Sequence, residues 1–78
     1  MARVLLFGRL ADVAGWRSRE VEGASIADIR SALGEDADLA EALAGKGVQV
    51  AVDKAIVRGE AALTAASEVA FMPPMSGG

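Results

Sequence analysis

Hydrophobic residues recur in this chain at two spacings, and the change from one to the other predicts strands separated by helices. Residues 3–10 form a short apolar run with the length of a buried strand. Residues 17–22 are polar around a single valine, which is typical of an edge strand. Residues 48–52 alternate valines with small or polar residues, the clearest strand pattern present. Residues 55–58 and 69–72 complete a predicted set of five strands.

The segment between the second and third predicted strands has helical spacing instead. Apolar residues at 26, 29, 32 and 33 share one helical face, and Ser25 followed by Asp28 has the form of a capping box. This predicts a helix over residues 26–33 that ends at Gly34. A second, shorter helix begins after Asp36 and closes at residues 45–47. Residues 60–67 are rich in alanine but lie between two strands, so we expect irregular structure there.

The predicted hairpin at positions 53 and 54 decides which apolar side chains point away from the helix. Opposed residues of a two-residue hairpin share a face, so the valines at 48, 50, 52 and 57 form the core side. Ile56 then lies on the other side, and strand alternation places Phe7 and Met72 there too. We expect these three residues to form an exposed patch that marks a protein contact. The alternative is the scattered apolar residues of an ordinary surface.

Composition limits the chemistry that side chains can perform. The chain has 78 residues, of which 53% are hydrophobic, enough for one small domain. It has no cysteine and no histidine, which excludes disulfides, zinc fingers and Cys–His or Ser–His pairs, and we expect no metal site. A net charge of −3 argues against nucleic-acid binding. Neither a membrane span nor a signal peptide is recognisable, so we expect no membrane association and a cytoplasmic location.

The last eight residues, Phe-Met-Pro-Pro-Met-Ser-Gly-Gly, contain the most specific signal in the sequence. Pro73 and Pro74 must end the last strand, and residues 73–78 would extend to roughly 20 Å. Glycine at the tip has no Cβ, so it can enter a narrow channel and leaves its carbonyl open to attack. In a domain without side-chain nucleophiles, this favours the α-carboxylate of Gly78 as the reactive group, once another protein has activated it. The alternative is a frayed terminus of small residues.

Residues 68–78, Glu-Val-Ala-Phe-Met-Pro-Pro-Met-Ser-Gly-Gly, resemble the ending of molybdopterin synthase small subunits, Glu-Val-Ala-Phe-Phe-Pro-Pro-Val-x-Gly-Gly. The resemblance extends to the opening strand with Phe7, the helix start at Ser25 and the valines before the hairpin. It implies an α+β fold of the ubiquitin-like β-grasp type, with a mixed sheet of about five strands and one main helix packed on one face. It also implies a β-grasp domain at residues 1–72 and an extended reactive tail at residues 73–78.

The same resemblance implies a sulfur carrier that has no catalytic residues of its own and binds no cofactor. A partner adenylyltransferase, similar to ubiquitin-activating enzymes, would use ATP to adenylate Gly78, and the adenylate would become a thiocarboxylate. The large synthase subunit would hold the catalytic residues and assemble with the carrier as a heterotetramer for molybdenum cofactor biosynthesis. The inserting part of the tail would comprise Pro73, Pro74, Met75, Ser76 and Gly77. The apolar partner surface would comprise Phe7, Ile56 and Met72.

Two other functions remain open on the sequence. A carrier of sulfur for thiamine or another small molecule would use the same Gly-Gly chemistry, but such proteins usually lack Pro-Pro in this arrangement. A ubiquitin-like binding module or protein tag would act through its sheet face, and Gly78 would be found in an isopeptide bond to a lysine.

Overall fold

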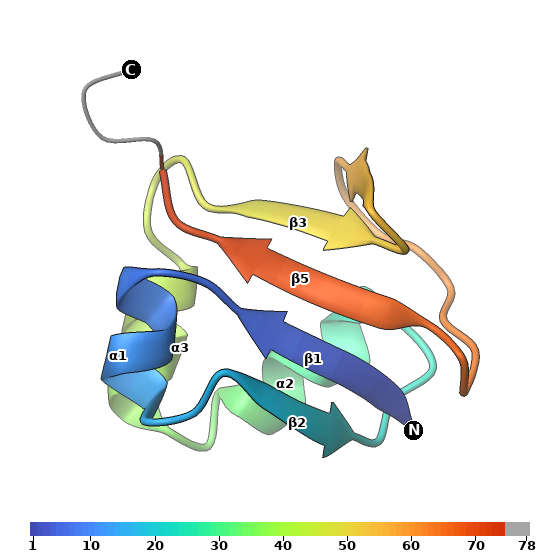
Figure 1. Ribbon diagram of the computed structural model, residues 1–78, viewed down its shortest axis with the longest axis horizontal. Helices are drawn as coiled ribbons and strands as arrows, with labels where there is room; N and C mark the ends of the chain where they lie inside the picture. Colours follow the sequence, from blue (N-terminus) through green and yellow to red (C-terminus); the bar gives the residue numbers. More distant parts are fainter. Residues whose placement is uncertain (75–78) are drawn as a thin grey trace.

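The computed structural model describes residues 1–74, which form one mixed sheet with helices against it (Figure 1). The elements follow in the order β1 (Ala2–Leu6), α1 (Arg9–Ala14), β2 (Ser18–Val21), α2 (Ile26–Leu33), α3 (Ala37–Leu43), β3 (Gln49–Val52), β4 (Ala55–Val57) and β5 (Glu68–Met72). The strand order is β2-β1-β5-β3-β4. β1 and β5 are parallel, and the other three pairs are antiparallel. This arrangement confirms the predicted β-grasp fold.

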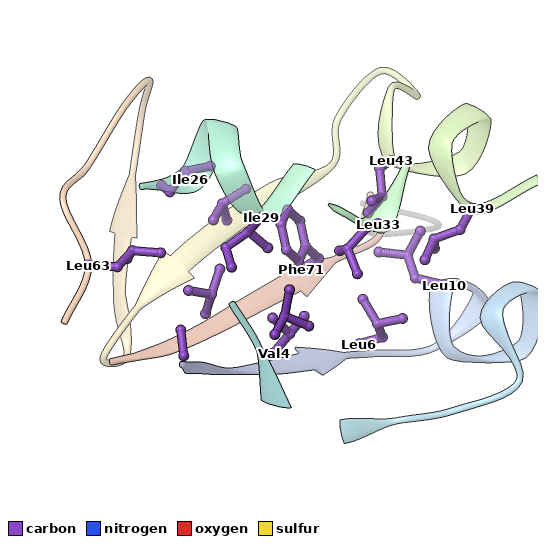
Figure 2. Close-up of a cluster of buried hydrophobic side chains, with 14 of the residues drawn as sticks. Val4, Leu6, Leu10, Ile26, Ile29, Leu33, Leu39, Leu43, Leu63 and Phe71 are labelled. Atoms are coloured by element: carbon purple, nitrogen blue, oxygen red, sulfur yellow. The ribbon is translucent and has the colours of Figure 1, made fainter. Parts of the chain in front are cut away.

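The helices lie on one side of the sheet and at one of its ends. α2 crosses one face, while α1 and α3 pack against each other beside the ends of β1 and β5 (Figure 1). The buried side chains fill the space between helices and sheet, with the fully buried ring of Phe71 near the middle (Figure 2). β5 is therefore both the central strand of the sheet and a main contributor to its core.

Both predicted helices form where the capping residues place them. Ser25 caps α2, since its hydroxyl accepts a hydrogen bond from the Asp28 N–H at 3.2 Å. The Asp28 carboxylate reaches back to the Ala24 N–H at 3.0 Å, one residue before the position that a standard capping box uses. Asp36 caps α3 in the same manner, with one carboxylate oxygen accepting from the N–H groups of Asp38 and Leu39.

The predicted strand over residues 3–10 is wrong in its second half. β1 ends at Leu6, and α1 begins at Arg9. Gly8 separates the two elements, since its φ of 54° and ψ of −130° lie where only glycine is at ease. Leu10 is buried, as a strand would bury it, but it reaches the core from a helix. A run of apolar residues does not by itself distinguish these two ways of burying the same side chain.

The hairpin between β3 and β4 has the predicted register. Ala51 pairs with Ile56, and the two turn residues Asp53 and Lys54 have φ values of 50° and 74°. Positive φ at both positions is the geometry of a primed turn, whose twist matches that of the flanking strands. Asp53 also connects this turn to the start of β5, because its carboxylate accepts from the Glu68 N–H at 2.9 Å.

Residues 60–67 are irregular, as expected, but they are attached to α2 at several points. Glu60 accepts hydrogen bonds from the N–H groups of Ile26 at 2.8 Å and Ala27 at 3.2 Å. Ala62 forms an isolated bridge with Ser25, and Leu63 is buried in the core. The loop therefore supplies part of the cap of α2 and part of its packing. No helix within residues 1–74 has the length and apolarity that a bilayer crossing requires.

Candidate functional site

The tail leaves the domain from the end of its central strand. The carbonyl of Phe71 accepts from the Phe7 N–H at 3.2 Å, just beyond the paired residues of β1 and β5. Pro73 and Pro74 follow Met72 directly, and neither has an N–H with which to continue the ladder. The chain departs at the end of the sheet where α1 and α3 lie (Figure 1).

Two glycines from distant parts of the chain lie against these prolines. Pro73 is the nearest neighbour of the position at which Gly8, which precedes α1, would carry a Cβ, and Pro74 is the nearest neighbour of the same position on Gly47, which precedes β3. Beside them a surface hollow of about 510 Å³ opens between α1, α3 and the prolines. Arg9 is part of its lining. The remaining lining residues are Leu10, Ala42, Gly45, Lys46, Val48, Pro73 and Pro74.

The face of the sheet opposite the helices is the second part of the site. We call it the outer face, and by register and alternation its apolar residues are Leu5, Phe7, Ala51, Ile56, Ala70 and Met72. The same registers place the polar residues Arg3, Ser18, Glu20, Gln49 and Glu68 on this face. Leu5, Ala70, Ala51 and Ile56 form one row across β1, β5, β3 and β4. Ile56 is 51% exposed and Phe7 47%, while Met72 is partly buried. The alanines of β3 and β5 lie between the larger apolar side chains of β1 and β4, so an apolar row crosses the outer face among polar residues.

The structure thus brings Phe7, Ile56 and Met72 to the same side of the sheet, with Phe7 and Met72 close to the tail. Whether a partner binds there stays a prediction. Pro73 and Pro74 directly follow β5, and their insertion into a partner stays a prediction. The remaining predicted site residues, Met75, Ser76, Gly77 and Gly78, lie outside the described residues.

Within residues 1–74, the side chains do not assemble a metal-binding cluster. No group of three or more carboxylate, histidine or cysteine side chains converges there closely enough to hold a metal ion. Each buried side-chain nitrogen and oxygen of this part has a hydrogen-bond partner. What the described residues offer is an apolar row across the outer face and a shaped base for the tail.

Sequence reasoning missed the contacts of Gly8 and Gly47 with the tail. Gly47 was expected to close a helix, and Gly8 lay inside a predicted strand. Each contact joins residues that are far apart in sequence, so no local pattern reveals it. The available signal was a glycine within an apolar run, which often marks close approach of another backbone.

Three comparisons relate this geometry to known proteins. The model of the ThiS family matches residues 4–78, nearly the whole chain. Among solved structures, the chain is similar to SAMP1 from Haloferax volcanii, at 30% identity and a TM-score of 0.85, over 99% of this chain and 98% of that one. No curated protein sequence matches it.

Two more distant structures share the fold. The small archaeal modifier protein 1 of Methanosarcina acetivorans is 21% identical, with a TM-score of 0.84 over 99% of this chain and 95% of that one. A complex of subunits 1 and 2 of molybdopterin-converting factor from Helicobacter pylori 26695 matches at 18% identity and a TM-score of 0.75. That match covers 99% of this chain and 97% of the matched one.

Proposed function

The chain belongs to the ThiS family of ubiquitin-like sulfur carriers, and from this premise we propose that it is the sulfur-carrier subunit of a molybdopterin synthase. The observation that carries the proposal is the ending, in which Pro73 and Pro74 follow the central strand β5 directly and Gly77 and Gly78 come after two further residues. Gly78 carries the sulfur as a thiocarboxylate. Beside the base of the tail, the outer face offers Phe7 and Met72 to the large subunit.

The chemistry needs two steps before sulfur is delivered. A carboxylate oxygen of Gly78 attacks the α-phosphate of ATP, pyrophosphate leaves, and a glycyl adenylate remains. Sulfide (HS⁻) then attacks the glycyl carbonyl, AMP leaves, and loss of a proton gives the thiocarboxylate. The tip has no side chain beyond hydrogen at Gly77 or Gly78, so the carbonyl stays accessible to the attacking sulfur. Since the chain has neither cysteine nor histidine, a partner adenylyltransferase must supply the catalytic groups.

The large subunit is the proposed acceptor of the loaded tail. The Helicobacter pylori structure is a complex of two subunits, and the fold it shares with this chain supports such a partner. In the complex, residues 75–78 enter the large subunit, the sulfur passes to the pterin precursor, and water returns Gly78 to the carboxylate. The outer face remains with the large subunit throughout this transfer.

Intact mass tests the carrier chemistry directly. The chain is incubated with a candidate adenylyltransferase, ATP and a sulfur source, in parallel with a chain that lacks Gly78. We expect the full chain to gain the mass of one oxygen-to-sulfur exchange and the shortened chain to gain nothing. An unchanged mass, with an adenylyltransferase that modifies another carrier, would contradict the proposal.

A protein modifier is the second candidate function, and the similarity to SAMP1 over nearly the whole length favours it. Activation of Gly78 is common to both functions, and the acceptor distinguishes them. A branched peptide joining Gly78 to a lysine would favour the modifier, whereas sulfur in the pterin product would favour the synthase subunit. Co-purification with a thiazole synthase would instead point to the thiamine pathway.

A further inference from the structure

Each proline at the base of the tail lies against a glycine with positive φ. Gly8 has a φ of 54° and Gly47 a φ of 88°. A Cβ on Gly8 would lie 3.2 Å from Pro73 Cγ, and a Cβ on Gly47 would lie 2.8 Å from Pro74 Cβ. Both distances are shorter than the 3.5–4.0 Å or so at which carbon atoms pack best. Glycine is therefore needed at both positions for two reasons: φ is positive, and a Cβ would come too close to the proline.

Other glycines of the chain show that the two requirements are separable. Gly15 has a φ of 84° and Gly59 a φ of 98°, and no atom lies within 4 Å of a Cβ built on either. At these positions only the positive φ favours glycine, because a Cβ would have space. The space above Gly8 and Gly47, by contrast, is occupied by the tail itself.

We propose that Gly8 and Gly47 form a socket for the two prolines that determines the direction in which the tail leaves the domain. They are thus positioning residues for the reaction at Gly78, and this inference rests on the proposed function. Each proline ring restricts its own φ to about −65°, so two seated rings define the backbone as far as Pro74. Residues 75–78 then span at most about 13 Å to the reactive carbon.

The direction in which the tail leaves the domain matters because the partner must bind the domain and the tail at the same time. With the outer face bound to a partner, the reactive carbonyl has to reach a catalytic site at a set distance and angle. A misplacement of about 1 Å in such a geometry can lower a rate by about 100-fold. A Cβ in the socket would displace Pro74 and thereby change the direction of everything that follows.

The test compares Gly47→Ala with Gly59→Ala, which imposes similar backbone strain without touching the tail. Thermal unfolding measures the strain. Time-resolved energy transfer measures the distance between Trp16, the single tryptophan, and an acceptor dye at position 76. The dye is attached through Ser76→Cys, which is the only cysteine in the labelled chain. The donor is well placed, since it packs against the core and the Arg19 guanidinium lies 4.6 Å from its ring centroid. The third readout is kcat/KM for thiocarboxylate formation by the adenylyltransferase, measured without the label.

We expect both substitutions to lower the midpoint of unfolding to a similar extent. Only Gly47→Ala should also change the distribution of distances between Trp16 and residue 76 and lower kcat/KM by about 10- to 100-fold. In a Pro74→Gly background the Cβ of Pro74 is absent, so the clash with the new Cβ at position 47 is removed. Gly47→Ala should then lower kcat/KM no more than Gly59→Ala does. If Gly47→Ala fails to fold, Gly8→Ala tests the other half of the socket, since its Cβ would lie 3.2 Å from Pro73 Cγ and should also change the distance distribution.

Three results would overturn the inference. The first is an unchanged distance distribution in both Gly47→Ala and Gly8→Ala. The second is a kcat/KM for Gly47→Ala within twofold of that for Gly59→Ala. The third is a loss of kcat/KM on Gly47→Ala that is equally large in the Pro74→Gly background. That result would show that backbone strain alone causes the loss. A wild-type chain that is never thiocarboxylated would contradict the proposed function instead, and the distance measurement would still decide on the socket.

Discussion

Glu60 shows how one side chain can compensate for the irregular backbone around it. Its carboxylate accepts hydrogen bonds from the N–H groups of Ile26, Ala27 and Ala61. The first two belong to the first turn of α2, whose N–H groups have no partner within the helix. A negative charge at this end also interacts favourably with the helix dipole. The loop before β5 is thereby attached to the helix that covers the sheet.

Replacing Glu60 with alanine should therefore destabilise the domain without changing its fold. We expect a loss of about 1–2 kcal/mol, the range for helix caps and for hydrogen bonds to a charged group. For a domain of this size that corresponds to a fall in melting temperature of roughly 4–8 °C per kcal/mol. Glu60→Gln keeps one acceptor oxygen and should lie between alanine and wild type. Equal melting temperatures for alanine and wild type would show that water replaces the carboxylate without loss.

At the scale of elements, alternation along the strands was enough to predict the hairpin and its register. Valines two residues apart settle which face is buried, and a two-residue turn then settles the pairing. The same local information located α2, because the cap at Ser25 and the glycine at its end bound an amphipathic stretch. It failed at α1, where Leu10 continues an apolar run although Gly8 has already turned the chain. It also failed at the socket, since no local pattern around Gly47 predicts that Pro74 lies close to it.

The outer face gives a prediction that belongs to the sheet as a whole. Ile56 lies on the edge strand β4 and is 51% exposed, so Ile56→Glu should leave folding intact. If the outer face binds the large subunit, a carboxylate there must lose water on binding, and we expect the dissociation constant to rise at least about tenfold. Titration against the large subunit measures this change.

The matched control for that titration is Ser31→Glu, which adds the same charge at an exposed position on α2. It should leave the dissociation constant within about twofold, since exposed charges far from an interface act weakly at physiological salt. Equal affinities for the two variants would place the partner surface elsewhere on the domain. A loss of affinity in both would indicate general electrostatic repulsion.

At the scale of the whole molecule, the sheet topology connects the fold to the chemistry. The first and last strands, β1 and β5, lie side by side, so the last described strand occupies the middle of the sheet. The core contains Phe71 but no residue after it among those that the structure describes. Pro73 and Pro74 therefore follow the central strand directly, and neither belongs to the described core.

A chain shortened to residues 1–74 should consequently fold as the full chain does. We expect its melting temperature to remain within about 2 °C, because the buried core described within residues 1–74 is kept and the two prolines stay in the socket. It should also retain the outer face, and so compete with the full chain for the large subunit while delivering no sulfur. Calorimetry and inhibition of product formation by added shortened chain measure the two effects. A melting temperature lower by 10 °C would show that residues 75–78 pack on the domain, and absence of competition would show that binding depends on the tail alone.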